Sequence, residues 1–225
     1  MAFTAWLALF GLIALAWLIG DSPKDRTVVA SLAACGLSTL AFWCARGRLA
    51  PLVARWGASP GAKFVAIGSL GAAWVETVFW ALERAFGASG VAASPNLALD
   101  LLATMPWYVP MVALLWVVQR RHRYSLYEVL MLGGVYELGA DGIVGPFVGG
   151  TLAPASAPLA ALLFPMLVIA YSFMVLPASA LLRADLDALR GGAAPAGDAT
   201  RYAYGLLPLL GLAPYVALGF LIMLA

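Results

Sequence analysis

Long apolar stretches separated by short polar segments run along the whole chain. Spanning about 30 Å of hydrocarbon as a helix takes roughly 20 mostly apolar residues. Seven stretches meet this length, at 2–20, 27–45, 64–86, 97–118, 126–149, 157–182 and 203–224. The alternating pattern of outer-membrane strands is absent. The pattern therefore predicts an all-α, polytopic bundle of seven transmembrane helices that forms a single transmembrane domain over residues 1–225.

Composition supports a membrane protein over a soluble one. Hydrophobic residues make up 64% of the chain and charged residues 11%, which leaves too little polar surface to cover a soluble core. The stretch at 2–20 is too long, and its N-terminal flank too poor in positive charge, for a cleaved signal peptide, so we interpret it as a span. The segment 183–202 contains GGAAPAGD, which is typical of a flexible linker.

Lysine and arginine are distributed unevenly between the two sides of the predicted bundle. Those that follow the second, fourth and sixth predicted helices are Arg46, Arg48, Arg55, Lys63, Arg120, Arg121, Arg123, Arg183, Arg190 and Arg201. On the other side lie only Lys24, Arg26 and Arg84. The positive-inside rule then puts the N-terminus and the linker 183–202 in the cytoplasm and the C-terminus outside. We expect a prokaryotic cytoplasmic membrane, membrane lipids as neighbours and no nucleic-acid partner; a homodimer is left open.

The residue inventory excludes most familiar catalytic groups. The single histidine, His122, lies in the basic loop QRRHR, which argues against a histidine-built metal site. The only lysines, Lys24 and Lys63, lie at helix ends, so a retinal Schiff base in the last helix is excluded. No P-loop, GxSxG or HExxH motif is present. We therefore expect neither a cofactor nor a metal, and the remaining candidates for chemistry are carboxylates.

Several carboxylates fall within the apolar stretches, where each costs at least about 2.5 kcal/mol. Glu76 lies near mid-depth of the third predicted helix, seven residues before Glu83. Glu137 and Asp141 are four residues apart in the fifth, so each pair lines one helical face. Asp100 joins them from the outer end of the fourth. If these faces meet, Glu76, Asp100, Glu137 and Asp141 form an acidic chamber whose crowded carboxyl groups could donate a proton to a substrate.

Simpler interpretations stand beside this one. Glu83 and Arg84 together are typical of an interfacial ion pair, and Asp100 suits the first turn of a helix. Glu76 and Glu137 could serve only as hydrogen-bonded contacts between helices. The candidate ligand contacts are aromatic residues, which are more often packing residues or interface anchors. They are Trp80, Trp107, Tyr108, Tyr136 and Phe173.

Five segments carry a resemblance to a known family. They are WCARGRLAPLVARW (43–56), GAAWVETVFW (71–80), LDLLATMPWYVPMVALLWVVQRRHR (99–123), LGGVYELGAD (132–141) and PLAALLFPMLVIAYSFMVLPASALL (158–182). This run resembles the emopamil-binding protein, or EXPERA, family, which includes sterol delta-8 to delta-7 isomerase and sigma-2-type receptors. The shared features are a glutamate followed by an aromatic residue, an acid before a proline-containing helix ending in Arg-x-His, a Gly-Tyr-acid helix and a late Leu-Pro.

The resemblance implies a bundle with a membrane cavity for a sterol-like or cationic amphiphilic ligand. Glu76 would match the family's proton-handling glutamate, Asp100 its second acid, and Glu137 or Asp141 the acid of the tyrosine-bearing helix. The chain departs from the family's isomerases at Ala72, where they carry histidine, and at Ala170 and Phe173, where they carry asparagine and tryptophan.

Three classes of function remain open from the sequence. The first is a membrane protein that binds, or isomerises or cyclises by proton transfer, a sterol- or isoprenoid-like lipid. The second is a proton- or cation-coupled transporter of small molecules, which would use the same acids as coupling sites. The third is a non-catalytic subunit of a membrane complex, which would need none of them.

Overall fold

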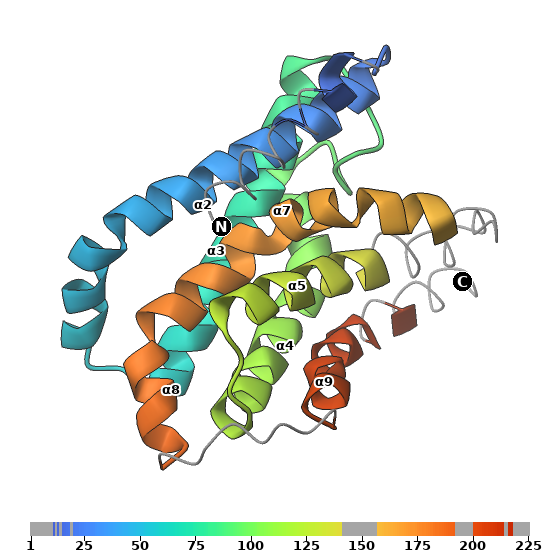
Figure 1. Cartoon of the computed structure of the whole chain (residues 1–225). Coiled ribbons are helices and arrows are strands. Elements are labelled where there is room, and N and C mark those ends of the chain that lie inside the picture. Colours follow the sequence, from blue (N-terminus) through green and yellow to red (C-terminus); the bar gives the residue numbers. More distant parts are fainter. Residues whose placement is uncertain are drawn as a thin grey trace.

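The described part of the chain consists of helices joined by short connections (Figure 1). The computed structural model describes residues 11, 13, 15–18, 20–140, 157–191, 200–213 and 216–217, with only the backbone for 157–163. The helices are α2 (Pro23–Arg55), α3 (Pro60–Ala85), α4 (Leu97–Arg121), α5 (Leu126–Glu137), α7 (Ala157–Leu181), α8 (Arg183–Leu189), α9 (Thr200–Gly205) and the 3₁₀ helix η3 (Leu207–Leu212). Within the described ranges no residue is in a β-strand, as the all-α prediction requires.

Four of the described helices are long and apolar enough to cross a membrane. They are Pro23–Arg55, Pro60–Ala85, Leu97–Arg121 and, within α7, Phe164–Leu181. These four helices indicate an integral membrane protein. The predicted number of seven spans and the predicted orientation stay predictions.

Polar caps explain where the helices begin. Ser22 and Asp25 form a capping box at the start of α2, and Ser125 and Glu128 form a second one at the start of α5. The side chain of Asn96 accepts hydrogen bonds from two backbone amides in the first turn of α4. Each cap satisfies amide groups that have no partner within the helix, so these short polar segments fix the helix boundaries.

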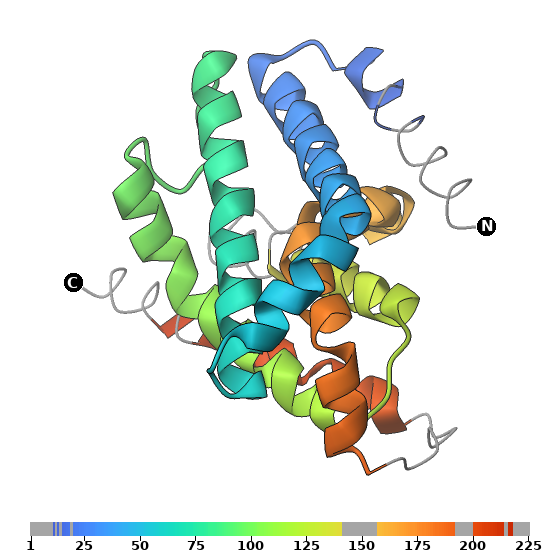
Figure 2. The same ribbon diagram turned by 90° about the vertical axis from the view of Figure 1, so that its left-hand side faces the viewer.

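Helix α7 lies at the centre of the bundle and packs against α2, α3 and α5, while α4 packs against α3 and η3 (Figures 1 and 2). Small residues allow two close approaches. A Cβ atom on Gly71 of α3 would lie 2.6 Å from the carbonyl oxygen of Phe173, and one on Gly211 would lie 2.6 Å from the amide nitrogen of Met111. Glycine at these positions therefore brings the backbone of α3 against α7, and that of η3 against α4.

The helix predicted at 27–45 is considerably longer in the structure. It begins at Pro23 and continues to Arg55, so the basic segment that was expected to be a loop is largely helical. The Ala-, Leu- and Arg-rich sequence favours helix beyond the apolar stretch, and the helix even includes Pro51. Ser59 then caps α3, which leaves a short connection.

The last third of the chain differs from the predicted pattern as well. The predicted span 203–224 is broken, because α9 ends at Gly205 and a separate 3₁₀ helix follows with Pro208 near its start. The predicted linker 183–202 begins with the helix Arg183–Leu189, which ends before Gly191 at φ +64°. Residues 192–199 lie outside the described residues.

The predicted spans 2–20 and 126–149 are described only in part. The described positions 11, 13 and 15–18 of the first are helical. Helix α5 ends at Glu137 and is followed by a π-helical turn at 138–140. The rest of both spans, including Asp141, lies outside the described residues.

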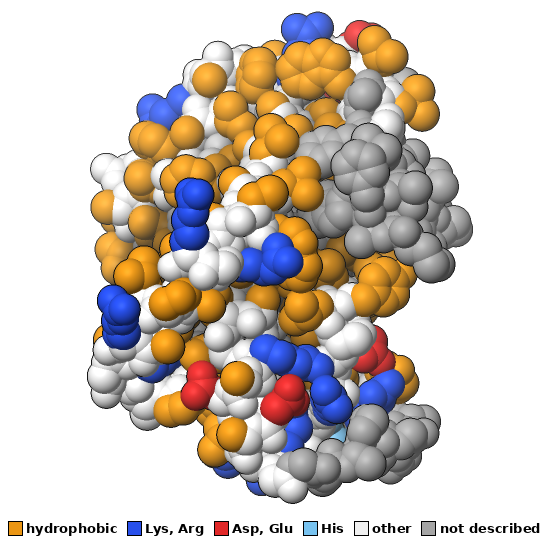
Figure 3. All heavy atoms as spheres, turned by 60° about the vertical axis from the view of Figure 1, so that its left-hand side comes forward, with side chains coloured by type: hydrophobic (Ala, Val, Ile, Leu, Met, Phe, Trp, Pro, Cys, Tyr) orange, Lys and Arg blue, Asp and Glu red, His pale blue; other side chains and the backbone are white. Residues whose placement is uncertain are grey.

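Arginine side chains join the connections at one end of the bundle, which we call the basic end. Arg190 donates to the carbonyl oxygen of Gln119 at 2.8 Å, which ties the segment after α8 to α4. Arg201 pairs with Glu128 at 2.6 Å and so ties α9 to α5. Lys and Arg side chains gather on the lower part of the surface in Figure 3. The segments after α4 and α7 therefore lie close together.

Candidate functional site

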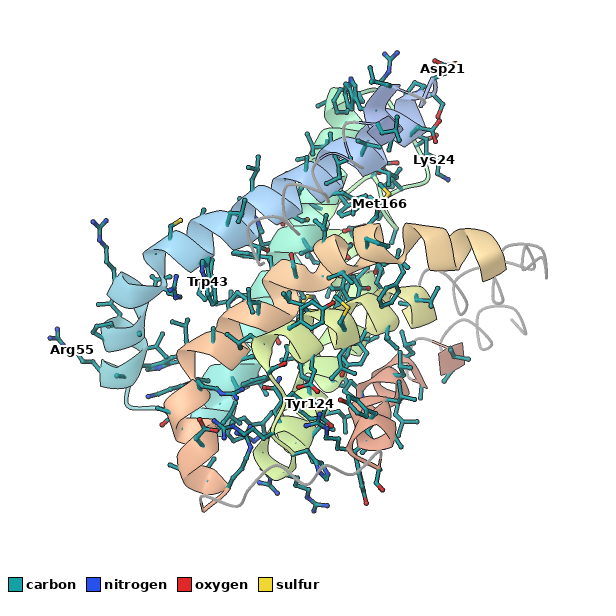
Figure 4. All side chains as sticks on the ribbon, in the orientation of Figure 1. Asp21, Lys24, Trp43, Arg55, Tyr124 and Met166 are labelled. Atoms are coloured by element: carbon teal, nitrogen blue, oxygen red, sulfur yellow. The ribbon has the colours of Figure 1, made fainter. Side chains whose placement is uncertain are left out.

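A cavity of about 590 Å³ lies among the helices, towards the end of the molecule opposite the basic end. In Figure 4, Lys24 marks the end of the molecule nearer the cavity, and Tyr124 marks the basic end. Helices α2, α3, α4, α5 and α7 contribute to its wall, together with η3 and the segment 86–96 between α3 and α4. The polar or charged side chains that line it are Lys24, Glu76, Thr104, Tyr108, Glu137 and Tyr171.

Glu76 is anchored to a group of buried aromatic residues. The hydroxyl of Tyr108 donates a hydrogen bond to a carboxylate oxygen of Glu76, and it lies 3.2 Å from the hydroxyl of Tyr171. Trp107 stacks on Tyr108 with 4.1 Å between ring centroids, and Tyr171 meets Tyr108 edge-on at 5.7 Å. The carboxylate of Glu76 on α3 and the phenol groups of Tyr108 on α4 and Tyr171 on α7 are thus connected in one network beside the cavity.

Glu137 lines the same cavity from another helix. It is the last residue of α5, its side chain is buried, and the π-helical turn that follows begins immediately after it. Glu76 on α3 and Glu137 on α5 are 61 residues apart in the sequence, yet both face this one space. Of the three described acids expected to form the chamber, Glu76 and Glu137 line the cavity, and the fourth expected acid, Asp141, lies outside the described residues.

Asp100 occupies a different position from the one expected of it. Its side chain is completely buried in the first turn of α4, where one carboxylate oxygen accepts a hydrogen bond from the amide of Ser94 at 3.1 Å. Asp100 therefore binds the segment before its own helix and is absent from the cavity lining. The simpler interpretation, a residue of the first helical turn, describes it better than membership of an acidic chamber.

The expected ion pair between Glu83 and Arg84 is also replaced by other contacts. The carboxylate of Glu83 accepts hydrogen bonds from the amides of Val91 at 3.0 Å and Ala92 at 2.8 Å. The guanidinium of Arg84 instead lies 4.6 Å from the ring centroid of Trp80. Neighbouring residues on a helix point in different directions, so Glu83 faces the inside and Arg84 the outside.

The five candidate aromatic contacts separate into two groups. Trp107 and Tyr108 line the cavity. Trp80 donates its indole N–H to the carbonyl oxygen of Pro95 at 3.1 Å, at the surface. Tyr136 and Phe173 are absent from the lining.

Tyr136 and Phe173 have structural contacts instead. The buried hydroxyl of Tyr136 donates to the carbonyl oxygen of Gly205 at 2.8 Å and so joins α5 to α9. Phe173 packs against Trp74, with 6.5 Å between ring centroids. Both residues therefore connect helices, and neither lines the cavity.

Sequence reasoning missed Tyr171 and Thr104. Tyr171 is the single tyrosine in the middle of a largely apolar helix whose other polar residues are Ser172 and Ser179, which is a usable signal because its hydroxyl needs a partner there. Thr104 lies one turn after Asp100, and its hydroxyl donates to the carbonyl oxygen of Asp100 at 2.9 Å. Such bonding within a helix is common for threonine, so the sequence carried no signal that Thr104 lines a cavity.

Apolar residues close the cavity towards the basic end. Along α4 and α7, the turns that follow Tyr108 and Tyr171 in that direction are filled by Met111, Leu115 and Met174, all of them buried. Beyond this layer Gln119 donates to the hydroxyl of Ser179 at 2.8 Å. In the described part of the chain the cavity thus ends above a packed apolar layer.

Searches of the chain against protein-family models, curated proteins and solved structures find no match. Among the described residues, no group of three or more His, Cys, Asp or Glu side chains lies close enough to hold a metal ion. The residues themselves define the class: a protein with helices suited to a membrane and a cavity between them that is lined by carboxylates and aromatic rings.

Proposed function

We propose that this integral membrane protein binds a sterol- or isoprenoid-like lipid in the cavity and transfers a proton to or from it through Glu76. The observation that carries the proposal is the hydrogen bond from Tyr108 to Glu76 in a buried aromatic wall. A cavity of about 590 Å³ also suits a small lipophilic ligand, because such sites commonly measure about 300–1,000 Å³.

The two cavity carboxylates suit the isomerisation of an alkene. Glu76, in its protonated form, gives its proton to one alkene carbon, and the double bond supplies the electron pair for the new C–H bond. Glu137 then accepts a proton from a neighbouring carbon, whose C–H electrons form the new double bond. No net oxidation occurs, and the proton returns from Glu137 to Glu76 between turnovers. The converse assignment of the two carboxylates is chemically equivalent.

The aromatic rings suit the charge that this reaction develops. Trp107, Tyr108 and Tyr171 present π-systems next to the carboxylates, and such faces stabilise a carbocation or an ammonium group. A cationic amphiphile would be held by the same groups without reaction. Binding of such a compound is thus expected whether or not the lipid is converted.

The resemblance to the emopamil-binding protein family agrees with this proposal in part. Ala72 and Ala170, which replace that family's polar residues, are buried. Here tyrosines, Tyr108 on α4 and Tyr171 on α7, provide the hydroxyl groups beside Glu76. The proposed proton-handling network of this chain therefore uses phenol groups where the family's isomerases use histidine and asparagine.

One observation favours a transporter as a second candidate. The segment 200–213 is interrupted between α9 and η3, and Leu212 of η3 lines the cavity. Interrupted helices beside a binding site are frequent in secondary transporters. The packed layer at Met111, Leu115 and Met174 opposes a route through the bundle in this conformation.

Mass spectrometry of co-purifying lipids tests the proposal. The wild type, Glu76→Gln and the control Glu128→Gln would be purified in a mild detergent; Glu128 pairs with Arg201 at the basic end. We expect a sterol- or isoprenoid-like lipid with the wild type and with Glu128→Gln, and altered retention with Glu76→Gln. The proposal is refuted if no such lipid is found and if Glu76→Gln leaves binding of cationic amphiphiles unchanged.

A further inference from the structure

The segment 86–96 forms part of the cavity wall at the end opposite the basic end. Four consecutive residues of this segment, Gly90, Val91, Ala92 and Ala93, line the cavity. Gly90 and Ala93 are exposed, and Val91 and Ala92 are half-buried. A stretch that has one side on the cavity and the other side exposed is a wall one chain thick.

Side-chain carboxylates, and not backbone pairing, hold this wall in place. Turn-type backbone hydrogen bonds continue from α3 only as far as the amide of Ala88, and among the described residues the amides of 89–94 donate none to a backbone carbonyl. The amides of Val91 and Ala92 are bound by Glu83, and that of Ser94 by Asp100.

Both carboxylates lie beneath the wall and are withdrawn from water. Glu83 is 8% exposed and Asp100 is fully buried. A buried carboxylate is stabilised chiefly by the hydrogen bonds that it accepts, so these acids and the three amides depend on one another. This arrangement satisfies both carboxylate oxygens of Glu83 and one of the two of Asp100.

Two glycines give the segment points at which it can turn. Gly87 has φ +63° and Gly90 has φ +78°, which are values that residues with a Cβ atom adopt only at a cost. At the far end the indole of Trp80 binds the carbonyl oxygen of Pro95. Residues 87–94 therefore form a unit between two fixed points.

Resting on the lipid binding proposed above, we propose that residues 87–94, the entrance segment, move aside to admit a ligand to the cavity, and that Glu83 and Asp100 hold the segment in its place against the cavity. The opposite direction is closed by the packed layer at Met111, Leu115 and Met174. Glu83 and Asp100 are thus positioning residues: they affect access of the ligand to the cavity and take no part in the proposed proton transfer by Glu76.

Thiol labelling tests this without any ligand. In a background in which Cys35→Ala and Cys44→Ser remove the native thiols, Thr104→Cys places a reporter on the cavity wall. Its reaction with a membrane-impermeant methanethiosulfonate reports opening of the entrance segment. Because glutamine offers one acceptor oxygen in place of two, Glu83→Gln should speed labelling by roughly tenfold, which corresponds to the loss of one hydrogen bond to a charged group.

Two further variants separate opening from general loosening. Gly87→Ala strains the backbone of the entrance segment, because alanine adopts a φ of +63° only at a cost. No atom lies within 4 Å of the added Cβ, so the substitution disturbs no carboxylate. It should also speed labelling. Glu128→Gln, at the basic end, should leave the rate unchanged. A second reporter, Ala178→Cys, lies buried below the packed layer and should stay unlabelled in every variant.

The proposal is overturned by any of three results. The first is an unchanged rate at Thr104→Cys in both Glu83→Gln and Gly87→Ala. The second is fast labelling already in the reporter background. The third is parallel acceleration at Ala178→Cys, since that would show loss of packing throughout the bundle.

Discussion

The contact between Tyr108 and Glu76 leads to a quantitative prediction. In Tyr108→Phe the ring remains and only the hydroxyl is lost, so stacking on Trp107 is kept while a carboxylate oxygen of Glu76 loses its donor. Tyr108 is 2% exposed, so water does not replace that donor freely. Loss of the donor to this buried oxygen costs about 1–3 kcal/mol.

The magnitude can be separated from neighbouring effects by a double-mutant cycle. Tyr171→Phe, the matched control, removes a phenol that bonds the same hydroxyl at 3.2 Å but leaves the donor to Glu76 in place; we expect about 0.5–1.5 kcal/mol. In the Glu76→Gln background, Tyr108→Phe should cost less than in the wild type, because the carboxyl group that the hydroxyl binds is then absent. The coupling between the two positions should exceed about 0.5 kcal/mol.

The assay is reversible unfolding by SDS in mixed micelles, followed by circular dichroism. All four members of the cycle are compared at one pH and one detergent ratio. Strict additivity of Tyr108→Phe and Glu76→Gln would refute the reasoning, as would equal costs for Tyr108→Phe and Tyr171→Phe, because either result means that the hydroxyl does not act through the carboxylate.

Two further predictions concern packing and the basic end. Gly71→Ala should destabilise the bundle by about 1–3 kcal/mol, because its Cβ would lie 2.6 Å from the carbonyl oxygen of Phe173; Gly47→Ala, with no atom within 4 Å, should be neutral or mildly stabilising in the same unfolding assay. Burial raises the pKa of Tyr124 to about 12, above the value of about 10 for an unfolded chain. Its contribution to stability is therefore complete below about pH 10 and lost as the pH rises towards 12, so the thermal midpoint of the wild type should converge on that of Tyr124→Phe over this range; parallel curves would contradict it.

Much of the fold follows from apolar stretch length and capping residues. Asn96 and Ser125 cap helices that begin where the predicted stretches do, whereas Ser22 and Ser59 mark starts that lie four residues before the apolar stretches. The extension of α2 to Arg55 does not follow from hydropathy, because hydropathy marks the apolar part of a helix and says nothing of where helical backbone ends. The break after Gly205 could have been expected from Gly205 and Pro208, since they oppose a continuous helix.

The site could be predicted less completely than the fold. Glu76 and Glu137 attract attention in any reading because a bilayer disfavours them, and both line the cavity. The same argument applies to Glu83 and Asp100, yet these accept amide hydrogen bonds from the connecting segment. The free-energy cost of placing an acid in the bilayer identifies candidate residues from the sequence. Only the tertiary structure decides whether such an acid binds backbone amides or faces the cavity. Tyr171 was missed because its importance comes from its neighbour on another helix.

Photo-crosslinking tests the central claim, a lipid-like ligand at Glu76, most directly. A sterol or polyisoprenoid analogue that carries a diazirine would be photolysed with the protein in lipid nanodiscs, and the labelled peptides mapped by mass spectrometry. The account predicts adducts at cavity residues such as Val75, Tyr108 and Tyr171, competed by the unlabelled lipid and reduced in Glu76→Gln but not in Glu128→Gln. Adducts confined to outward-facing residues such as Leu70 and Leu102, which are exposed, and equal in all variants, would contradict it.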